Sequence, residues 1–245
     1  MDKETHMIRS LETDRIIHIY VGEILPGTKP FRVQQVLLEQ LSDYFSGALR
    51  DKAFCEGEEG RLHFPEDDLD VWEVLLYWLF RRSLPQWVDV DSETKESLLI
   101  RCWVLADKYQ VHDFQNEAMM DIMMHQSQHP ACIRNLMHGV KVTAAGSKLR
   151  RIMAEELVWQ VYIKKDIQFT ESDQLDGSSF IGDFLTAKVH FDQNNNVFAG
   201  PAKFGATMST TPGEGPPGVW KEYMVGEWLP RRAWRLHDTM KYWVF

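Results

Sequence analysis

The sequence IIHIYV at Ile16–Val21, followed by FRV at Phe31–Val33 and RLHF at Arg61–Phe64, decides the fold. Each segment is short and rich in β-branched or aromatic residues, which is typical of strands. Gly22 ends the first segment and Pro65 ends the third. The turn between the first two holds a glycine between two prolines, which is ordinary turn chemistry. The sequence therefore predicts a small sheet of three short strands.

After the second strand the apolar residues change to a helical period. In Gln35–Leu49 they recur at spacings of three and four, and Ser42 or Asp43 is a candidate N-cap that divides the run into two short helices. The acidic run Glu66–Asp70 suits the positive end of a helix dipole and opens the apolar helix Val71–Phe80. We therefore expect helices on both sides of the third strand.

Four further helices are expected from capping residues and apolar spacing. They cover 92–109, 113–129 and, with a junction at Gly146-Ser147, 131–163. The sequence thus predicts an α+β protein, in which a small mixed sheet is flanked by a helical cluster and followed by a helical and irregular extension.

Residues 165–245 have a different composition. They hold eight of the 15 glycines and five of the ten prolines, and residues 207–218 (TMSTTPGEGPPG) read as a linker. Aromatic residues nevertheless return after the linker, at Trp220, Tyr223, Trp228, Trp234, Tyr242, Trp243 and Phe245. Disordered chains are poor in aromatics. We expect these residues to be core, and a recognition surface is the alternative.

Composition excludes several classes of protein. The 245 residues are 44% hydrophobic and 26% charged, which is ordinary for a globular protein with its own core. The three cysteines are widely spaced and form no CxxC, so neither a disulfide framework nor a zinc site is expected, and reduced thiols point to the cytoplasm or nucleus. No apolar run reaches the length of a membrane span, and no signal peptide is expected.

Charge is distributed unevenly along the chain. Residues 1–130 hold 13 Lys and Arg against 24 Asp and Glu, whereas residues 131–245 hold 14 against 12. An acidic half repels a phosphate backbone, so no nucleic-acid partner is expected there. Two small basic clusters, Arg150-Arg151 and Arg231-Arg232 with Arg235, could bind an acidic partner or the acidic half of this chain.

Catalysis and metal binding find little support. Cys55 and His63 are eight residues apart with nothing to bring them together, and Cys102 lies on an apolar helix face. His125 and His129 have the i, i+4 spacing of metal ligands, but no supporting ligand lies nearby, and a solvated helix end is the simpler interpretation. We expect no catalytic residue, no metal, no cofactor and no small-molecule substrate.

Four motifs in register resemble the BTB/POZ domain, in the form common in fungal proteins. They are Phe31-Arg32-Val33, Ser42-Asp43-Tyr44-Phe45, Leu62–Asp68, and Leu105–Tyr109 followed by Val111. The resemblance covers residues 12–125, after a tail at 1–11. Residues 131–164 look like the helical continuation of such proteins, and 165–245 match no known fold.

The resemblance implies a non-enzymatic protein–protein interaction module. Its sharpest form is a substrate adaptor for a cullin-RING ubiquitin ligase, because cullin-binding members carry a hydrophobic-x-Glu motif before the third strand, where this chain has Phe54-Cys55-Glu56. Phe54 and Glu56 would then contact the cullin, and the alternative is that Phe54 packs on its own domain. A self- or hetero-associating scaffold is the second function, and an enzyme within 165–245 is a distant third.

Homodimerisation is less well supported by the resemblance. Dimerising members place Asp at the start of the first strand and a basic residue after a His beyond Phe-x-Val. This chain has Arg15 and Gln35 at those positions, Gln34 in place of the His, and Asp14 one residue away. The charge pair is not reproduced, so the sequence leaves the dimer open.

Overall fold

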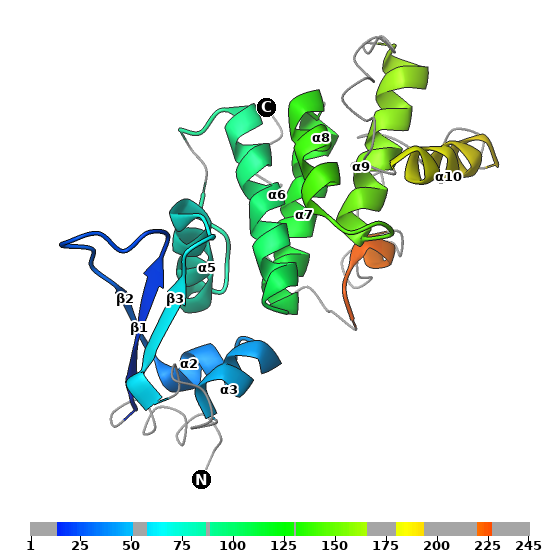
Figure 1. Ribbon diagram of the computed structural model, residues 1–245. Helices are drawn as coiled ribbons and strands as arrows, with labels where there is room; N and C mark the ends of the chain where they lie inside the picture. Colours follow the sequence, from blue (N-terminus) through cyan, green and yellow to red (C-terminus); the bar gives the residue numbers. More distant parts are fainter. Residues whose placement is uncertain are drawn as a thin grey trace, which may run out of the picture. The chain divides into compact units, whose positions relative to one another are not determined.

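The computed structural model describes residues 14–50, 58–86, 89–129, 131–165, 180–193 and 220–226. Its fold is α+β, mostly helical with one small sheet, as predicted (Figure 1). The chain forms two compact units, one of Met1–Gln86 with Leu105–Phe114 and the other of Trp87–Val104 with Gln115–Phe245. No helix among the described residues is both long and apolar enough to cross a membrane.

All three predicted strands are present, in the order β2-β1-β3. β1 (Ile16–Val21) pairs antiparallel with β2 (Phe31–Gln34) and parallel with β3 (Arg61–Phe64). Alternate residues of β1 are buried, and Ile17 and Ile19 are fully inaccessible. A parallel pair requires a crossover, and the helices between β2 and β3 provide it.

The helices of the first unit cover this sheet (Figure 1). They are α2 (Gln35–Glu39), α3 (Asp43–Arg50) and α5 (Leu69–Arg81), with the break between α2 and α3 at Ser42 as predicted. Aromatic side chains from α3, β3 and α5 form the centre of this core, and the Phe64 and Trp72 rings stack with centroids 4.7 Å apart. α5 ends where Arg82 adopts a left-handed φ of 50°.

The next two helices, α6 (Ser92–Lys108) and α7 (His112–Gln128), each contribute residues to both units. The division between the two units falls inside each helix. The second unit adds α8 (Ile133–Val142) and α9 (Lys148–Trp159), which η1 (Gln160–Lys164) continues. The predicted helices at 92–109, 113–129 and 131–163 are therefore confirmed. So is the junction at Gly146-Ser147, where the Ser147 side chain accepts a hydrogen bond from the Arg150 amide.

A close approach joins α8 to α9. A Cβ at Gly139 would lie 2.1 Å from the Met153 Cε and 3.4 Å from Ile100 Cγ2. Met153 is fully buried and cannot move aside into solvent. A larger residue at Gly139 would therefore require the buried Met153 side chain to repack.

The described parts of 165–245, the region without an expected fold, hold two elements. α10 (Phe180–Gln193) packs on α9 and buries Phe180, Ala187 and Phe191. η3 (Trp220–Tyr223) also packs on α9, with the Tyr223 ring fully buried. The core interpretation is thus confirmed for Tyr223. The linker 207–218 and the five aromatics from Trp228 onward lie outside the described residues.

Candidate interaction surface

The predicted cullin-contact residues Phe54 and Glu56 lie outside the described residues, as does Cys55. The chain that follows them is fixed by Arg15, whose guanidinium donates a hydrogen bond to the Glu58 carbonyl. Gly60 has a left-handed φ of 65°, and a Cβ there would lie 2.8 Å from Arg15 Nη2. Arg15, which the sequence flagged for its place in the first strand, therefore anchors the entry to β3.

Two of the motifs that carry the family resemblance meet at Asp67. Its carboxylate accepts hydrogen bonds from Trp72 Nε1 at 2.8 Å, from Lys108 Nζ at 2.8 Å and from the Tyr109 hydroxyl at 2.6 Å. The Asp67 side chain is 4% exposed. The PEDD segment and the LADKY segment, some forty residues apart in the sequence, are thereby joined by one carboxylate.

The Asp67 cluster brings one carboxylate acceptor together with three side-chain donors. Burial, reinforced by the hydrogen bond to the negatively charged Asp67, raises the pKa of Tyr109. The phenol therefore remains a protonated donor to Asp67. The acidic run does precede α5, but Asp67 accepts its hydrogen bonds from side chains.

The positions that the resemblance relates to dimerisation lie close together at the start of α2. Val36 donates its amide hydrogen to Asp14 Oδ2 at 2.8 Å, and the Gln35 amide donates to the Arg15 carbonyl at 2.8 Å. The Gln35 side chain donates to Glu39 on the same helix. Asp14 and Gln35 thus make hydrogen bonds at the start of α2, and these bonds lie within the same chain.

Three of the exposed large apolar side chains of the first unit lie on one helix. Leu69, Tyr77 and Phe80 are exposed on α5, and with Glu73 their spacing of four, four and three places them on one face. The opposite face of α5 is buried and carries Trp72. Large exposed apolar groups on a common face are typical of protein-binding surfaces.

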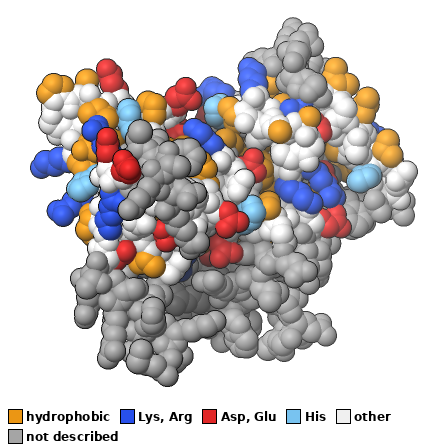
Figure 2. Space-filling model, turned by 60° about the horizontal axis from the view of Figure 1, so that its bottom comes forward, with side chains coloured by type: hydrophobic (Ala, Val, Ile, Leu, Met, Phe, Trp, Pro, Cys, Tyr) orange, Lys and Arg blue, Asp and Glu red, His pale blue; other side chains and the backbone are white. Residues whose placement is uncertain are grey.

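Charged and apolar side chains are interspersed on the face of the molecule that Figure 2 shows. No single sign of charge covers that face, as a nucleic-acid surface would require.

The interpretation of His125 as a solvated helix end is wrong. Its ring is buried, with Nε2 3.0 Å from the Ser92 hydroxyl, while His129 is exposed. Burial, together with Lys95 and His129, lowers the pKa of His125 to about 4. No group of three potential metal ligands occurs in the part of the chain that the structure describes.

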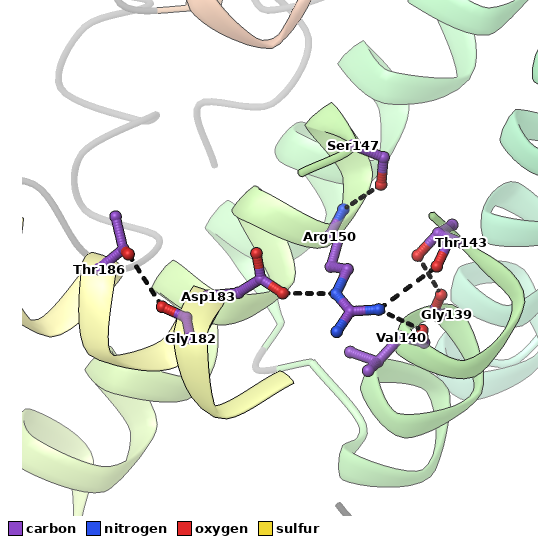
Figure 3. Close-up of polar contacts among 8 residues, drawn as sticks. All are labelled: Gly139, Val140, Thr143, Ser147, Arg150, Gly182, Asp183 and Thr186. Carbon is purple, nitrogen blue, oxygen red and sulfur yellow. Dashed lines mark hydrogen bonds and ion pairs between the residues drawn. The ribbon is translucent and has the colours of Figure 1, made fainter. Parts of the chain in front are cut away.

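The basic pair Arg150-Arg151 is not a free surface cluster. Arg150 is buried, and its guanidinium donates to Asp183 Oδ2 at 2.5 Å and to the carbonyls of Val140 and Thr143 (Figure 3). It thereby joins α9 to α10 and to the end of α8. Sequence reasoning missed this role because arginine is by default a surface residue.

Arg151 is also paired within the chain. It bonds Glu155 at 3.1 Å and Glu222 at 2.7 Å, and its guanidinium lies 5.0 Å from the centroid of the Tyr223 ring. The Tyr223 hydroxyl donates to Glu155 in turn. Within the described residues, Arg151 is therefore paired with α9 and η3 of the C-terminal half, and not with the acidic N-terminal half. Arg231, Arg232 and Arg235 lie outside the described residues.

No known protein family and no curated protein matches this chain.

Proposed function

We propose that the chain is a non-enzymatic protein–protein interaction module with a BTB/POZ-like core. The observation that carries the proposal is the contact at Asp67. Its carboxylate bonds Lys108 and Tyr109 and so links two of the four motifs on which the resemblance rests. The element order, two strands, two helices, a strand and three helices, supports it as well. The free thiols Cys102 and Cys132 fit a reducing compartment, the cytoplasm or nucleus.

The specific activity we propose is that of an adaptor between a substrate and a cullin-type ubiquitin ligase. Phe54 would fill a pocket on the cullin as a hot spot, worth about 2 kcal/mol, while Glu56 would orient the pair at the rim. Both follow α3 and precede the turn that Arg15 holds through Glu58. The second unit would then be the part that reads the substrate.

A scaffold without ligase links is the second candidate. The exposed face of α5, with Leu69, Tyr77 and Phe80, favours the scaffold. This face offers a binding surface that does not include Phe54 or Glu56. Such a scaffold would bind another protein, or a second copy, through α5.

A pull-down separates the two candidates. Purified wild-type protein, the Phe54→Ala/Glu56→Ala double variant and a Glu59→Ala control are each incubated with a cullin N-terminal domain. Glu59 is an exposed acidic residue three positions beyond Glu56, so its replacement controls for loss of charge. If the protein is an adaptor, the cullin domain should retain the wild type and the Glu59→Ala control, and should not retain the double variant.

The scaffold has a different signature. If no form of the folded protein is retained by the cullin, the adaptor proposal fails. Binding to a captured partner or to itself, lost on Phe80→Ala and kept in the Phe54→Ala/Glu56→Ala variant, would then support the scaffold.

A further inference from the structure

The sheet of the first unit has an outward side that carries positive charge. Residues paired across a sheet point to the same side of it, and successive residues of a strand point to opposite sides. The side that α2, α3 and α5 cover buries Ile17, Ile19 and Leu62 (Figure 1). The outward positions include His18 and Tyr20 on β1, Arg32 on β2, and Arg61 and His63 on β3. We call this set the basic face.

Two arginines flank one histidine in the basic face. His18 pairs with Arg32 on β2 and with Arg61 on β3, so the three side chains start from one row across the sheet. Both arginines are exposed. Because neighbouring strands lie about 4.8 Å apart, the Cα atoms of the two arginines are separated by about 10 Å. His18 lies between them, and even a neutral imidazole keeps one N–H that can donate to an anion.

Both arginines carry charge that the surrounding strands do not neutralise. The strands β1, β2 and β3 contain no acidic residue. Within the described ranges neither Arg32 nor Arg61 forms an ion pair with Asp or Glu, whereas Arg150 and Arg151 each do. Arg61 instead lies over the Tyr20 ring, with its guanidinium carbon 4.5 Å from the ring centroid. This contact restricts the Arg61 side chain before any partner binds, which lowers the entropy lost on binding.

The spacing of the arginines indicates the kind of anion that fits. Exposed side chains on a sheet surface do not enclose a small molecule, whose sites are typically concave. In a peptide with the polyproline II conformation, side chains three positions apart lie on the same side, about 9 Å from one another. Two carboxylates at that spacing match Arg32 and Arg61, and arginine forms strong charge-assisted bonds with carboxylates.

Acidic residues bound the basic face at both ends of β3. Glu58 and Glu59 precede this strand and Glu66 follows it, and all three are exposed. The whole chain has a net charge of −9. A nucleic acid would extend beyond the basic face onto these carboxylates and be repelled by them, whereas a short peptide can stay within the face. The charge pattern therefore favours a short acidic segment of another protein.

We propose that the basic face binds a short acidic segment of a partner protein. Arg32 and Arg61 each pair with one carboxylate of this segment, and His18 donates a hydrogen bond between them. The inference does not depend on the cullin contact at Phe54 and Glu56.

Fluorescence anisotropy with the full chain tests the proposal. The probe is a fluorescein-labelled peptide in which two prolines separate successive glutamates, because proline favours the polyproline II conformation. The control peptide has glutamine in place of every glutamate. The wild type should bind the acidic peptide, less tightly as the salt concentration rises, and should not bind the control peptide.

Substitutions locate the binding on the basic face. Arg32→Gln/Arg61→Gln should weaken binding of the acidic peptide at least about tenfold, because both charge-assisted bonds are lost. Arg81→Gln/Arg134→Gln is the matched control, since it removes the same charge from exposed positions of α5 and α8, and should change the affinity less than about twofold. Arg32→Lys/Arg61→Lys keeps the charge without the planar fork and should bind with an affinity between those of the wild type and the glutamine variant.

Three results would overturn the proposal. The folded wild type does not bind the acidic peptide, or it binds both peptides equally, or the glutamine and lysine variants of Arg32 and Arg61 bind as tightly as the wild type. An oligothymidine that binds more tightly than the peptide, and is lost in the same variants, would assign the basic face to nucleic acid instead. Urea unfolding that matches the wild type shows that each variant is folded.

Discussion

At the scale of single residues, Asp67 has the largest expected effect in the first unit. Asp67→Ala removes the acceptor of the buried Trp72 and Tyr109 donors, and of Lys108. Leaving buried donors without a partner costs about 1–3 kcal/mol each, so the free energy of unfolding should fall by about 3 kcal/mol. Urea unfolding followed by tryptophan fluorescence measures it.

The neighbouring Glu66→Ala is the control for this change. Glu66 is exposed, so the loss should stay within about 0.5 kcal/mol. Equal effects of the two substitutions would show that the Asp67 cluster contributes nothing particular to stability.

His125 gives the second unit a dependence on pH. Its pKa is lowered from 6.5 to about 4. As the pH falls below 6.5, His125 therefore becomes protonated in the unfolded chain. In the folded chain it stays neutral until about pH 4. The contribution of His125 to the free energy of unfolding should fall by about 3 kcal/mol across that window.

A second buried group, Glu96, acts in the opposite sense, because burial raises its pKa and the folded chain is then the first to bind its proton. The measurement must therefore compare wild type with His125→Gln, in which the Glu96 contribution is common to both. The stability difference between the two proteins should shrink as the pH falls from 7 to 4. A difference that does not change with pH would show that His125 titrates normally.

Residue roles were predictable where they follow from apolar spacing. Cys102 is buried on its helix face, as the spacing predicts. The buried charged residues Asp67, Glu96 and Arg150 were not predictable. Each is of a type that is normally solvated, and each is held by partners ten to forty-two positions away that no local pattern reveals.

At the scale of elements, the crossing of α8 and α9 rests on Gly139. Gly139→Ala would force a methyl group onto Met153, at 2.1 Å from its Cε. Overpacking of this kind costs about 1–3 kcal/mol, and thermal unfolding should show a lower midpoint.

Gly47 in α3 offers the matched control, because a Cβ there meets nothing within 4 Å. Gly47→Ala should leave stability unchanged or raise it by up to about 1 kcal/mol, since alanine is the better helix former. Destabilisation by both changes alike would contradict the close approach of α8 and α9.

The attachment of α10 depends on Asp183. Asp183→Ala removes this carboxylate from the buried Arg150, whose bonds to the carbonyls of Val140 and Thr143 are longer, at 3.3 and 3.4 Å. Breaking a buried pair in this way costs about 3 kcal/mol, and amide exchange in α10 should rise more than in α9.

Asp192→Ala breaks a surface pair with Lys188 on the same helix. That change should cost less than about 1 kcal/mol. If it loosens α10 as much as Asp183→Ala does, the buried pair is not what holds the helix.

Period and capping predicted most elements, including the three strands and the break at Ser42. α10 was missed, although Phe180, Phe184, Ala187 and Phe191 have helical spacing. The many glycines and prolines of residues 165–245 indicated irregular structure for the whole region, and this masked the helical spacing within it. The parallel pairing of β1 with β3 was also beyond prediction, because it depends on how the crossover helices α2 and α3 return the chain.

At the scale of the whole molecule, α6 and α7 contribute residues to both compact units. The sequence predicted a boundary near residue 125 from the extent of the resemblance, whereas compactness places Gln115–Phe245 with Trp87–Val104. The two divisions differ because the first follows the resemblance motifs along the sequence and the second follows packing.

The central claim is that this molecule recruits a cullin through Phe54 and Glu56. The most direct measurement is a calorimetric titration of the full chain with a cullin N-terminal domain. We predict saturable binding with one site per chain, weakened roughly thirtyfold by Phe54→Ala, which corresponds to about 2 kcal/mol. No heat of binding from a chain that unfolds cooperatively, or equal affinity of wild type and Phe54→Ala, would contradict the claim.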